Sequence, residues 1–123
     1  MAEHNDVGKW GEKVAQDYFL THGYAIAGTN VRIGKVEIDL IVIKDNRICF
    51  VEVKTRSTDF KDPAEAIDTR KRARMTKAAD LYVHTYNVPH DPQFDIFIVI
   101  GNPLHYTVEH IPDAFYPILN NGY

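Results

Sequence analysis

The segment from residue 36 to residue 56, VEIDLIVIKDNRICFVEVKTR, places the strongest limit on the fold of this chain. Two runs rich in Val, Ile and Phe flank a short polar break at residues 44–47, a pattern typical of a β-hairpin. Strands this apolar are usually buried, and burying a carboxylate is costly unless a partner compensates its charge. Four charged residues nevertheless interrupt the two runs: Glu37, Asp39, Glu52 and Lys54.

The register of the predicted hairpin brings these charges together. With a turn centred on residues 45–46, Asp39 lies opposite Glu52 and Glu37 lies opposite Lys54. Side chains alternate between the two faces of a strand, so all four charged residues are expected on one face. Opposed Cβ atoms are about 4.5–5.5 Å apart, which makes the two opposed carboxylates close neighbours. A loop with an odd number of residues, or a bulge, would change this parity.

Two carboxylates that close repel each other, and something must offset the repulsion. One of them can be protonated, Lys54 can neutralise the pair, or a divalent cation can bridge it. Because Glu37 adds a further negative charge, Mg²⁺ or Mn²⁺ fits this face: hard cations take oxygen ligands from one or two carboxylates together with water and phosphate. The simpler interpretation is a solvated strand face with ordinary ion pairs, although both strands are too apolar for a fully wet sheet.

Length and composition indicate one folded domain over residues 1–123. With 45% hydrophobic and 25% charged residues, the 123-residue chain is long enough for one hydrophobic core but not for two. It has no stretch of roughly 18 apolar residues and no signal-peptide core at its N-terminus, so we expect neither a membrane partner nor export. The single Cys49 has no disulfide partner within the chain, which suits the reducing cytoplasm.

Positive charge is concentrated after the hairpin. The net charge is −3, yet eight of the fourteen Lys and Arg residues lie between residues 54 and 77, against four acids. Such a segment is either a surface that faces phosphate groups or the solvated side of a helix. The negative total argues against a protein that binds nucleic acid through bulk charge alone.

Hydrophobic periodicity predicts the remaining elements. Apolar residues at three- and four-residue spacings indicate a helix over residues 6–22, and a strand is expected over 24–33. A second helix is expected from a cap at Asp62 through Tyr86, unless a second cap at residues 68–69 interrupts it.

Two further strands complete the chain. Residues 93–100 are apolar throughout, as in a strand buried on both faces, whereas residues 104–111 alternate as in a half-exposed edge strand. The resulting order, αβββαββ, predicts an α/β fold with a mixed β-sheet flanked by helices.

Other common kinds of site have no counterpart in the sequence. The six histidines and the single cysteine lack the spacing of zinc ligands. The chain has no glycine-rich nucleotide loop and no serine elbow, and no small-molecule organic cofactor is expected. What remains is an acid–acid–lysine face beside a basic helix. Phosphodiester hydrolysis uses this combination, because a metal ion holds the phosphate and activates water while a cation stabilises the developing charge.

In this hypothesis Asp39 and Glu52 hold the metal ion, and Lys54 orients the water or helps to deprotonate it. Flanking phosphates are held by basic side chains that follow in the sequence, namely Arg56, Arg70, Lys71 and Arg74. Two alternatives stay open: a non-catalytic nucleic-acid-binding module that retains the acidic cluster, and a protein whose acids hold only a structural ion. From the pattern alone, Glu12 is either a surface acid of the first helix or a further acid above the hairpin.

The same residues carry a resemblance to known proteins. Asp39, a hairpin turn and then Glu52-Val53-Lys54 are similar to the PD-(D/E)xK signature of restriction-endonuclease-like nucleases. More closely, residues 8–83 resemble the YraN family, small bacterial proteins regarded as endonucleases and similar to archaeal Holliday-junction resolvases. The blocks that carry this resemblance are GKWGEKVAQDYF, NVRIGKVEIDLIV and FVEVKTR, followed by Lys71, Ala78, Ala79 and Tyr82.

The resemblance implies a restriction-endonuclease-like fold and assigns roles in the site. It implies that Glu12 is the acid on the first helix and that Lys54 is the catalytic lysine. Asp39 and Glu52 correspond to the metal ligands, with the carbonyl of Val53 as a third. The implied cofactor is therefore Mg²⁺ or Mn²⁺.

The implied partner is DNA, including branched DNA. Resolution of a four-way junction needs two symmetric cuts, so that substrate predicts a homodimer. One departure from the signature is Ile38, which stands before Asp39 where the signature has proline. The acid of the signature is present as Asp39.

Overall fold

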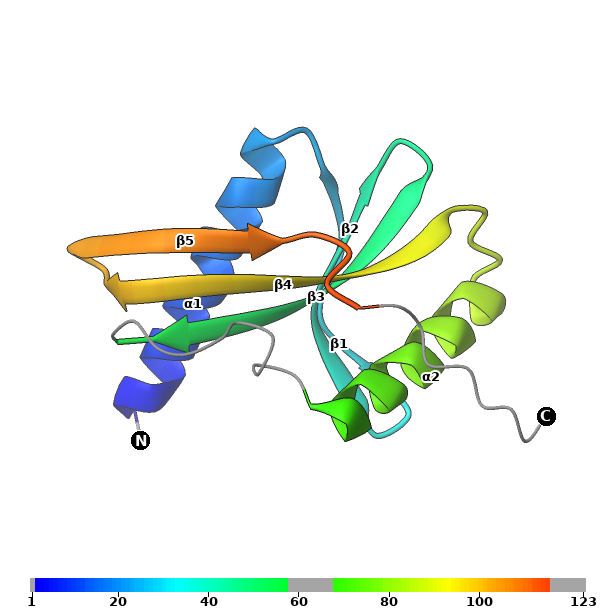
Figure 1. Cartoon of the computed structure of the whole chain (residues 1–123), viewed down its shortest axis with the longest axis horizontal. Helices are drawn as coiled ribbons and strands as arrows, with labels where there is room; N and C mark the ends of the chain where they lie inside the picture. Colours follow the sequence, from blue (N-terminus) through cyan, green and yellow to red (C-terminus); the bar gives the residue numbers. More distant parts are fainter. Residues whose placement is uncertain (1, 58–67, 116–123) are drawn as a thin grey trace.

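A five-stranded β-sheet carries one helix on each face (Figure 1). This computed structural model describes residues 2–57 and 68–115, and its elements follow the predicted order αβββαββ. The elements are α1 (Ala2–Thr21), β1 (Ala25–Ile33), β2 (Val36–Lys44), β3 (Arg47–Arg56), α2 (Thr69–Thr85), β4 (Asp91–Asn102) and β5 (His105–Ile111). The arrangement is the predicted restriction-endonuclease-like α/β fold. None of the helices in the described residues is long and apolar enough to cross a membrane.

The strand order is β1-β2-β3-β4-β5, and only the step from β3 to β4 is parallel. A parallel step needs a long crossover, and here the chain between β3 and β4 contains α2. The ladder between β3 and β4 runs from Arg47–Asp91 to Arg56–Ile100, which makes β4 longer than the predicted 93–100. The edge position of β5 is as predicted, but the strand is more exposed than the half-exposed strand that its alternating sequence predicted.

Helix boundaries follow local capping. The first helix begins at Ala2 rather than at residue 6, so residues 2–5 are helical as well. The second helix begins at Thr69, since the Asp68 side chain accepts the backbone N–H of Lys71 at 2.9 Å as an N-cap. The second predicted cap is thereby confirmed, whereas the earlier one at Asp62 lies outside the described residues.

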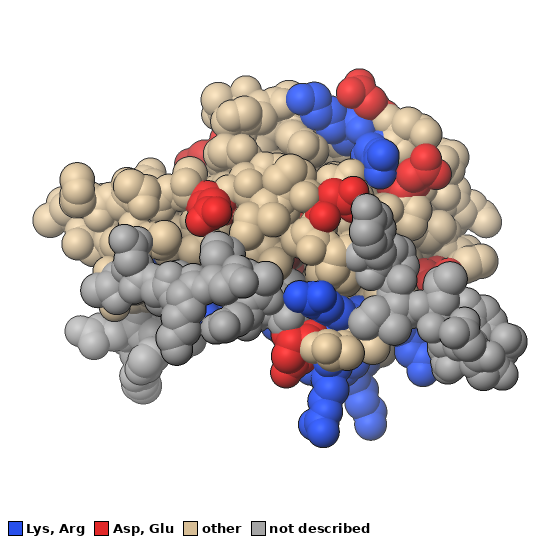
Figure 2. All heavy atoms as spheres, in the orientation of Figure 1, with Lys and Arg blue, Asp and Glu red and all other residues tan. Residues whose placement is uncertain are grey.

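The exposed side of α2 is basic. Arg70, Arg74 and Lys77 are exposed along the helix. Figure 2 shows Lys and Arg side chains projecting from the lower side of the molecule, where Figure 1 places α2. The opposite side of the helix is apolar and holds it on the sheet.

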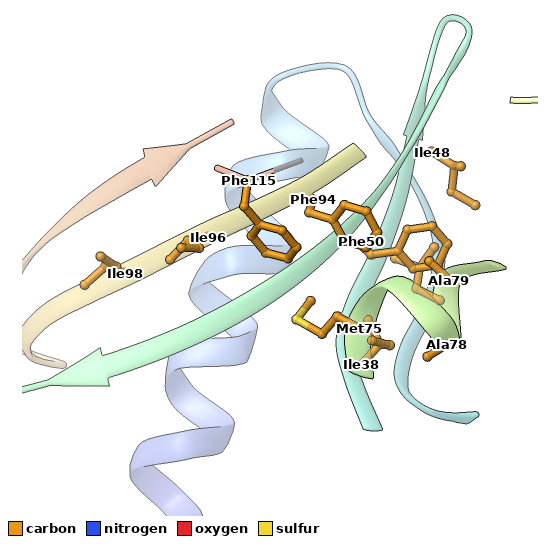
Figure 3. Packing of buried hydrophobic residues seen from close by; sticks show 11 residues of the cluster. Ile38, Ile48, Phe50, Met75, Ala78, Ala79, Phe94, Ile96, Ile98 and Phe115 are labelled. Atoms are coloured by element: carbon orange, nitrogen blue, oxygen red, sulfur yellow. The ribbon is translucent and has the colours of Figure 1, made fainter. Parts of the chain in front are cut away.

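A separate hydrophobic cluster fills the space under each helix. Below α2, Met75, Ala78 and Ala79 pack with residues of the sheet such as Phe50 (Figure 3). Phe115 joins this cluster and stacks on Phe94, with ring centroids 4.8 Å apart. Below α1, the buried residues are Ala15, Phe19, Leu40, Val42, Cys49, Val51, Phe97 and Val99. The sheet is therefore covered on both faces.

A buried polar network ties α1 to the far half of the sheet. The fully buried Asp95 places Oδ2 2.7 Å from Nε2 of His110, and Nδ1 of His110 lies 3.1 Å from the hydroxyl of Tyr18 on α1. Gln93 and the backbone N–H of Asp113 donate to the other carboxylate oxygen of Asp95. A satisfied network of this kind fixes the elements that contribute to it, and here it fixes the helix that carries Glu12.

Candidate active site

The candidate site lies where β2 and β3 separate. Their ladder confirms the predicted register from Lys44–Arg47 to Leu40–Val51. It ends there in the described residues, so the predicted pairing of Asp39 with Glu52 is not part of the ladder. The Asp39 carboxylate instead accepts the backbone N–H of Val53 at 2.9 Å. A buried N–H needs a partner, and here a side chain supplies it as the strands part.

This fork also separates the four charges that were expected on one face. Glu37 is exposed, and the Glu37–Lys54 pairing is not part of the ladder either. Beyond the Leu40–Val51 pair, residues 36–38 of β2 remain paired with β1, and residues 52–56 of β3 remain paired with β4. Asp39, Glu52 and Lys54 thus belong to the fork, and Glu37 does not.

The Asp39 carboxyl is partly buried and lies near other acids. Burial and then the neighbouring charge of Glu52 raise the pKa of the Asp39 carboxyl to about 7. Glu12 also raises this pKa, whereas the hydrogen bond from Val53 and the charge of Lys71 lower it. The ionised form is therefore disfavoured in the metal-free protein, and an added cation would favour it.

Glu52 is buried and carries two lysine partners. Its carboxylate oxygen Oε2 lies 2.5 Å from Nζ of Lys71 and 3.4 Å from Nζ of Lys54. Lys54 comes from the same strand, as predicted, whereas Lys71 reaches in from the first turn of α2. The sequence suggested only phosphate binding for Lys71, and that role stays a prediction beside the contact with Glu52.

Close packing of α1 on β3 places Glu12 at the site. A Cβ added at Gly11 would collide with the side chain of Thr55, so only glycine allows this approach. The Glu12 carboxylate accepts a hydrogen bond from Nδ2 of Asn30 at 3.0 Å. The resemblance placed Glu12 at this site, and the structure puts it there.

Asn30 is a site residue that sequence reasoning missed. It lies inside β1 with a positive φ of 49°, in the region that Asn tolerates better than most residues. The ladder between β1 and β2 skips it and runs from Thr29–Leu40 to Val31–Ile38. The available signal was an Asn inside an otherwise strand-like run.

An open cleft of about 720 Å³ joins most of these residues. Val7, Gly8 and Glu12 of α1 form one wall. The rest of the lining comes from β2, β3 and the residue after β3, namely Asp39, Val53, Lys54, Thr55, Arg56 and Ser57. The predicted phosphate contact Arg56 therefore borders the cleft, whereas Arg70 and Arg74 lie exposed on α2.

The donors at the fork fit a hard divalent cation. Asp39 and Glu52 offer carboxylate oxygens, and Val53 offers a carbonyl oxygen, the ligand types that Mg²⁺ and Mn²⁺ prefer. Among the described side chains, those of residues 6–57 and 68–115, no three His, Cys, Asp or Glu residues form a group that could hold a metal ion. A cation held here would therefore rely on two carboxylates together with water or phosphate, as Mg²⁺ commonly does.

Comparison with other proteins identifies the family. Residues 11–99 match the model of "Uncharacterised protein family UPF0102". A UPF0102 protein of Bacteroides thetaiotaomicron is 45% identical over 120 residues, covering 97% of this chain and 99% of the relative. A Bacteroides fragilis relative is 44% identical over 120 residues, with the same coverage. A Caldanaerobacter subterraneus relative is 43% identical over 114 residues, covering 89% of this chain and 93% of the relative. The chain therefore belongs to the UPF0102 family, the YraN family that its motifs resemble.

Proposed function

We propose that this protein is a metal-dependent endonuclease that hydrolyses phosphodiester bonds in DNA. The observation that supports this most strongly is the meeting of Asp39, Glu52 and Lys54 at one fork of the sheet, beside an open cleft. Glu12 enters the same cleft from a different element. Two acids and a lysine in this arrangement match what phosphodiester hydrolysis requires of a protein.

Each side chain has a distinct task in this proposal. Asp39 and Glu52 would hold Mg²⁺ or Mn²⁺, with the carbonyl of Val53 as a further ligand. The bound cation would supply Lewis-acid polarisation of the phosphate and a more acidic water. Lys54, already within ion-pair distance of Glu52, would orient the attacking water and stabilise the negative charge that develops on the phosphate. Glu12, fixed by Asn30, would orient the same water from the other wall of the cleft.

Basic residues around the cleft support DNA as the substrate. Arg56 borders the cleft, and Arg70 and Arg74 project from α2. Contacts of Lys and Arg with phosphates position a nucleic acid without reading its sequence, and they make binding depend on salt. Replacing both Arg70 and Arg74 by Ala should weaken DNA binding and reduce the slope of log K against log salt concentration by roughly 2. We also propose that the protein acts in the cytoplasm, where chromosomal DNA lies.

Branched DNA is the more specific form of the proposal. A four-way junction is resolved by two symmetric cuts, which would require two copies of the chain. The alternative is a binding module that retains the acids but cuts nothing. Both the endonuclease and the binding module would use the basic surface to bind DNA, and only the endonuclease would cut it.

A panel of labelled substrates separates these possibilities. Duplex, single-stranded, flap and four-way-junction DNA would each be incubated with Mg²⁺, Mn²⁺ or EDTA. The proposal predicts cutting that needs the metal ion and is lost in Lys54→Met, with DNA binding by the variant retained. Metal-independent binding without cutting in any substrate would support the binding module. Sedimentation of the protein on the preferred substrate would then show whether one copy or two are bound.

A further inference from the structure

Lys71 occupies a place that the proposed reaction does not explain. Its Nζ lies 2.5 Å from Oε2 of Glu52, and its side chain is 33% exposed. Lys54 lies 3.4 Å from the same oxygen atom. A carboxylate that is 5% exposed therefore carries two ammonium groups on one oxygen before any metal ion arrives.

The start of α2 holds Lys71 in this position. The Asp68 cap accepts the backbone N–H of Lys71 at 2.9 Å, which fixes the first turn of the helix. One turn later, Met75 is buried against the sheet and fixes the face that α2 presents. Lys71 is thus aimed at Glu52 by a backbone contact and by core packing, and not only by the attraction of the two charges.

Lys71 and a divalent cation compete for the same carboxylate. Without a cation, an ammonium group compensates the buried charge of Glu52, which would otherwise be costly. With a cation on Glu52, an ammonium group on the same oxygen would face a like charge at close range in a poorly solvated site. Both lysine side chains are partly exposed, at 27% for Lys54 and 33% for Lys71. Lys54 stays beside Glu52 because the two residues share a strand, whereas Lys71 reaches in from another element. Lys71 is therefore the partner that can leave.

We propose that Lys71 is an exchangeable counter-ion of Glu52. It neutralises Glu52 in the metal-free protein and withdraws when a divalent cation binds. Its ammonium group then becomes available to a phosphate of the bound DNA, which unites the contact with Glu52 and the predicted role in nucleic-acid binding. This inference rests on the proposed function, because it requires a cation at Asp39 and Glu52.

Calorimetric titration with Mn²⁺ in the absence of DNA tests the competition. Lys71→Met should bind Mn²⁺ about tenfold more tightly than the wild type, because one competing positive charge is removed. Lys71→Arg retains the charge and should bind Mn²⁺ like the wild type. Lys77→Met removes the same charge from an exposed position further along α2, and its Mn²⁺ affinity should not change. Equal or weaker binding by Lys71→Met overturns the inference.

Lysine footprinting of the wild-type protein tests the withdrawal without any substitution. Reductive methylation followed by mass spectrometry should label Lys71 several-fold faster in saturating Mn²⁺ than in EDTA, while Lys77 labels equally in both. Equal labelling of Lys71 in a protein that binds Mn²⁺ overturns the inference and leaves the proposed metal site intact. Absence of Mn²⁺ binding in the wild type and every variant overturns the metal site, and the inference with it.

Discussion

The carboxylate of Asp39 accepts the backbone N–H of Val53 at 2.9 Å, across the point where β2 and β3 separate. This contact fixes Asp39 beside Glu52 although the two residues are not paired in the ladder. The bond tolerates either a carboxylate or a carboxamide at position 39, since both can accept it. The charge at Asp39 can therefore be changed while its geometry is preserved.

Asp39→Asn should change the dependence of stability on pH in EDTA. The folded-state pKa of Asp39 is raised to about 7, so its stabilising effect is fully present below the unfolded-state pKa, falls as pH rises between the two pKa values, and is gone above about pH 7. The Asn variant cannot ionise and escapes this loss. Each pKa unit corresponds to about 1.4 kcal/mol, so Asn could gain up to about 4 kcal/mol over the wild type by pH 8.

Urea unfolding at pH 5 and pH 8 measures this difference. Glu37→Gln is the matched control, because Glu37 is an exposed acid two residues earlier on the same strand. Parallel stability curves for Asp39→Asn and the wild type would show that Asp39 is not held in a destabilising environment.

Gly11 and Gly8 should respond in opposite directions to alanine. A methyl group at Gly11 meets the side chain of Thr55, whereas one at Gly8 has no atom within 4 Å. Gly11→Ala should therefore cost about 1–3 kcal/mol through overpacking. Gly8→Ala should stabilise the helix by about 0.5–1 kcal/mol, because Ala loses less backbone entropy. Thermal unfolding measures the stability of the two variants relative to the wild type. A similar effect of both substitutions would mean that α1 does not approach β3 at Gly11.

Replacing Asn30 by a residue that tolerates its positive φ should affect cleavage more than stability. Asn30→Gly removes the hydrogen bond to Glu12 but tolerates the positive φ, whereas Asn30→Ala also adds about 1 kcal/mol of backbone strain. Both variants should slow metal-dependent cleavage by roughly tenfold, which is less than the roughly hundredfold or more that a positioned acid or base contributes, because Glu12 remains and only its orientation is lost. Only the Ala variant should unfold clearly more easily. Wild-type cleavage rates in Asn30→Gly would rule out a role for Asn30 in positioning Glu12.

The hairpin was predictable from sequence because its signals are local. A polar break between two apolar runs set the register, and the register from Lys44–Arg47 to Leu40–Val51 is as expected. The fork beyond Leu40 was not predictable, because it depends on a side chain of one strand bonding the backbone of another. Period-two reasoning consequently placed Glu37 with the other acids, although it is exposed.

The position of Lys71 depends on long-range structure. Its sequence neighbourhood is basic and indicated a solvated or phosphate-facing helix side. Whether it reaches Glu52 is decided by where α2 begins and how the crossover from β3 to β4 lays the helix on the sheet. Asn30 is a similar case, since its bond to Glu12 joins β1 to α1. For Glu12 it was the family resemblance, rather than the helical pattern, that indicated a place in the site.

The most direct test of the central claim compares two acids on one strand. Asp39→Ala and Glu37→Ala would be assayed for cleavage of the best DNA substrate in Mn²⁺, after circular dichroism confirms that both variants are folded. Because Asp39 lines the cleft and Glu37 does not, we expect a loss of cleavage of at least about a hundredfold in Asp39→Ala and near wild-type rates in Glu37→Ala. Equal activity of the two variants would contradict the assignment of the fork as the active site.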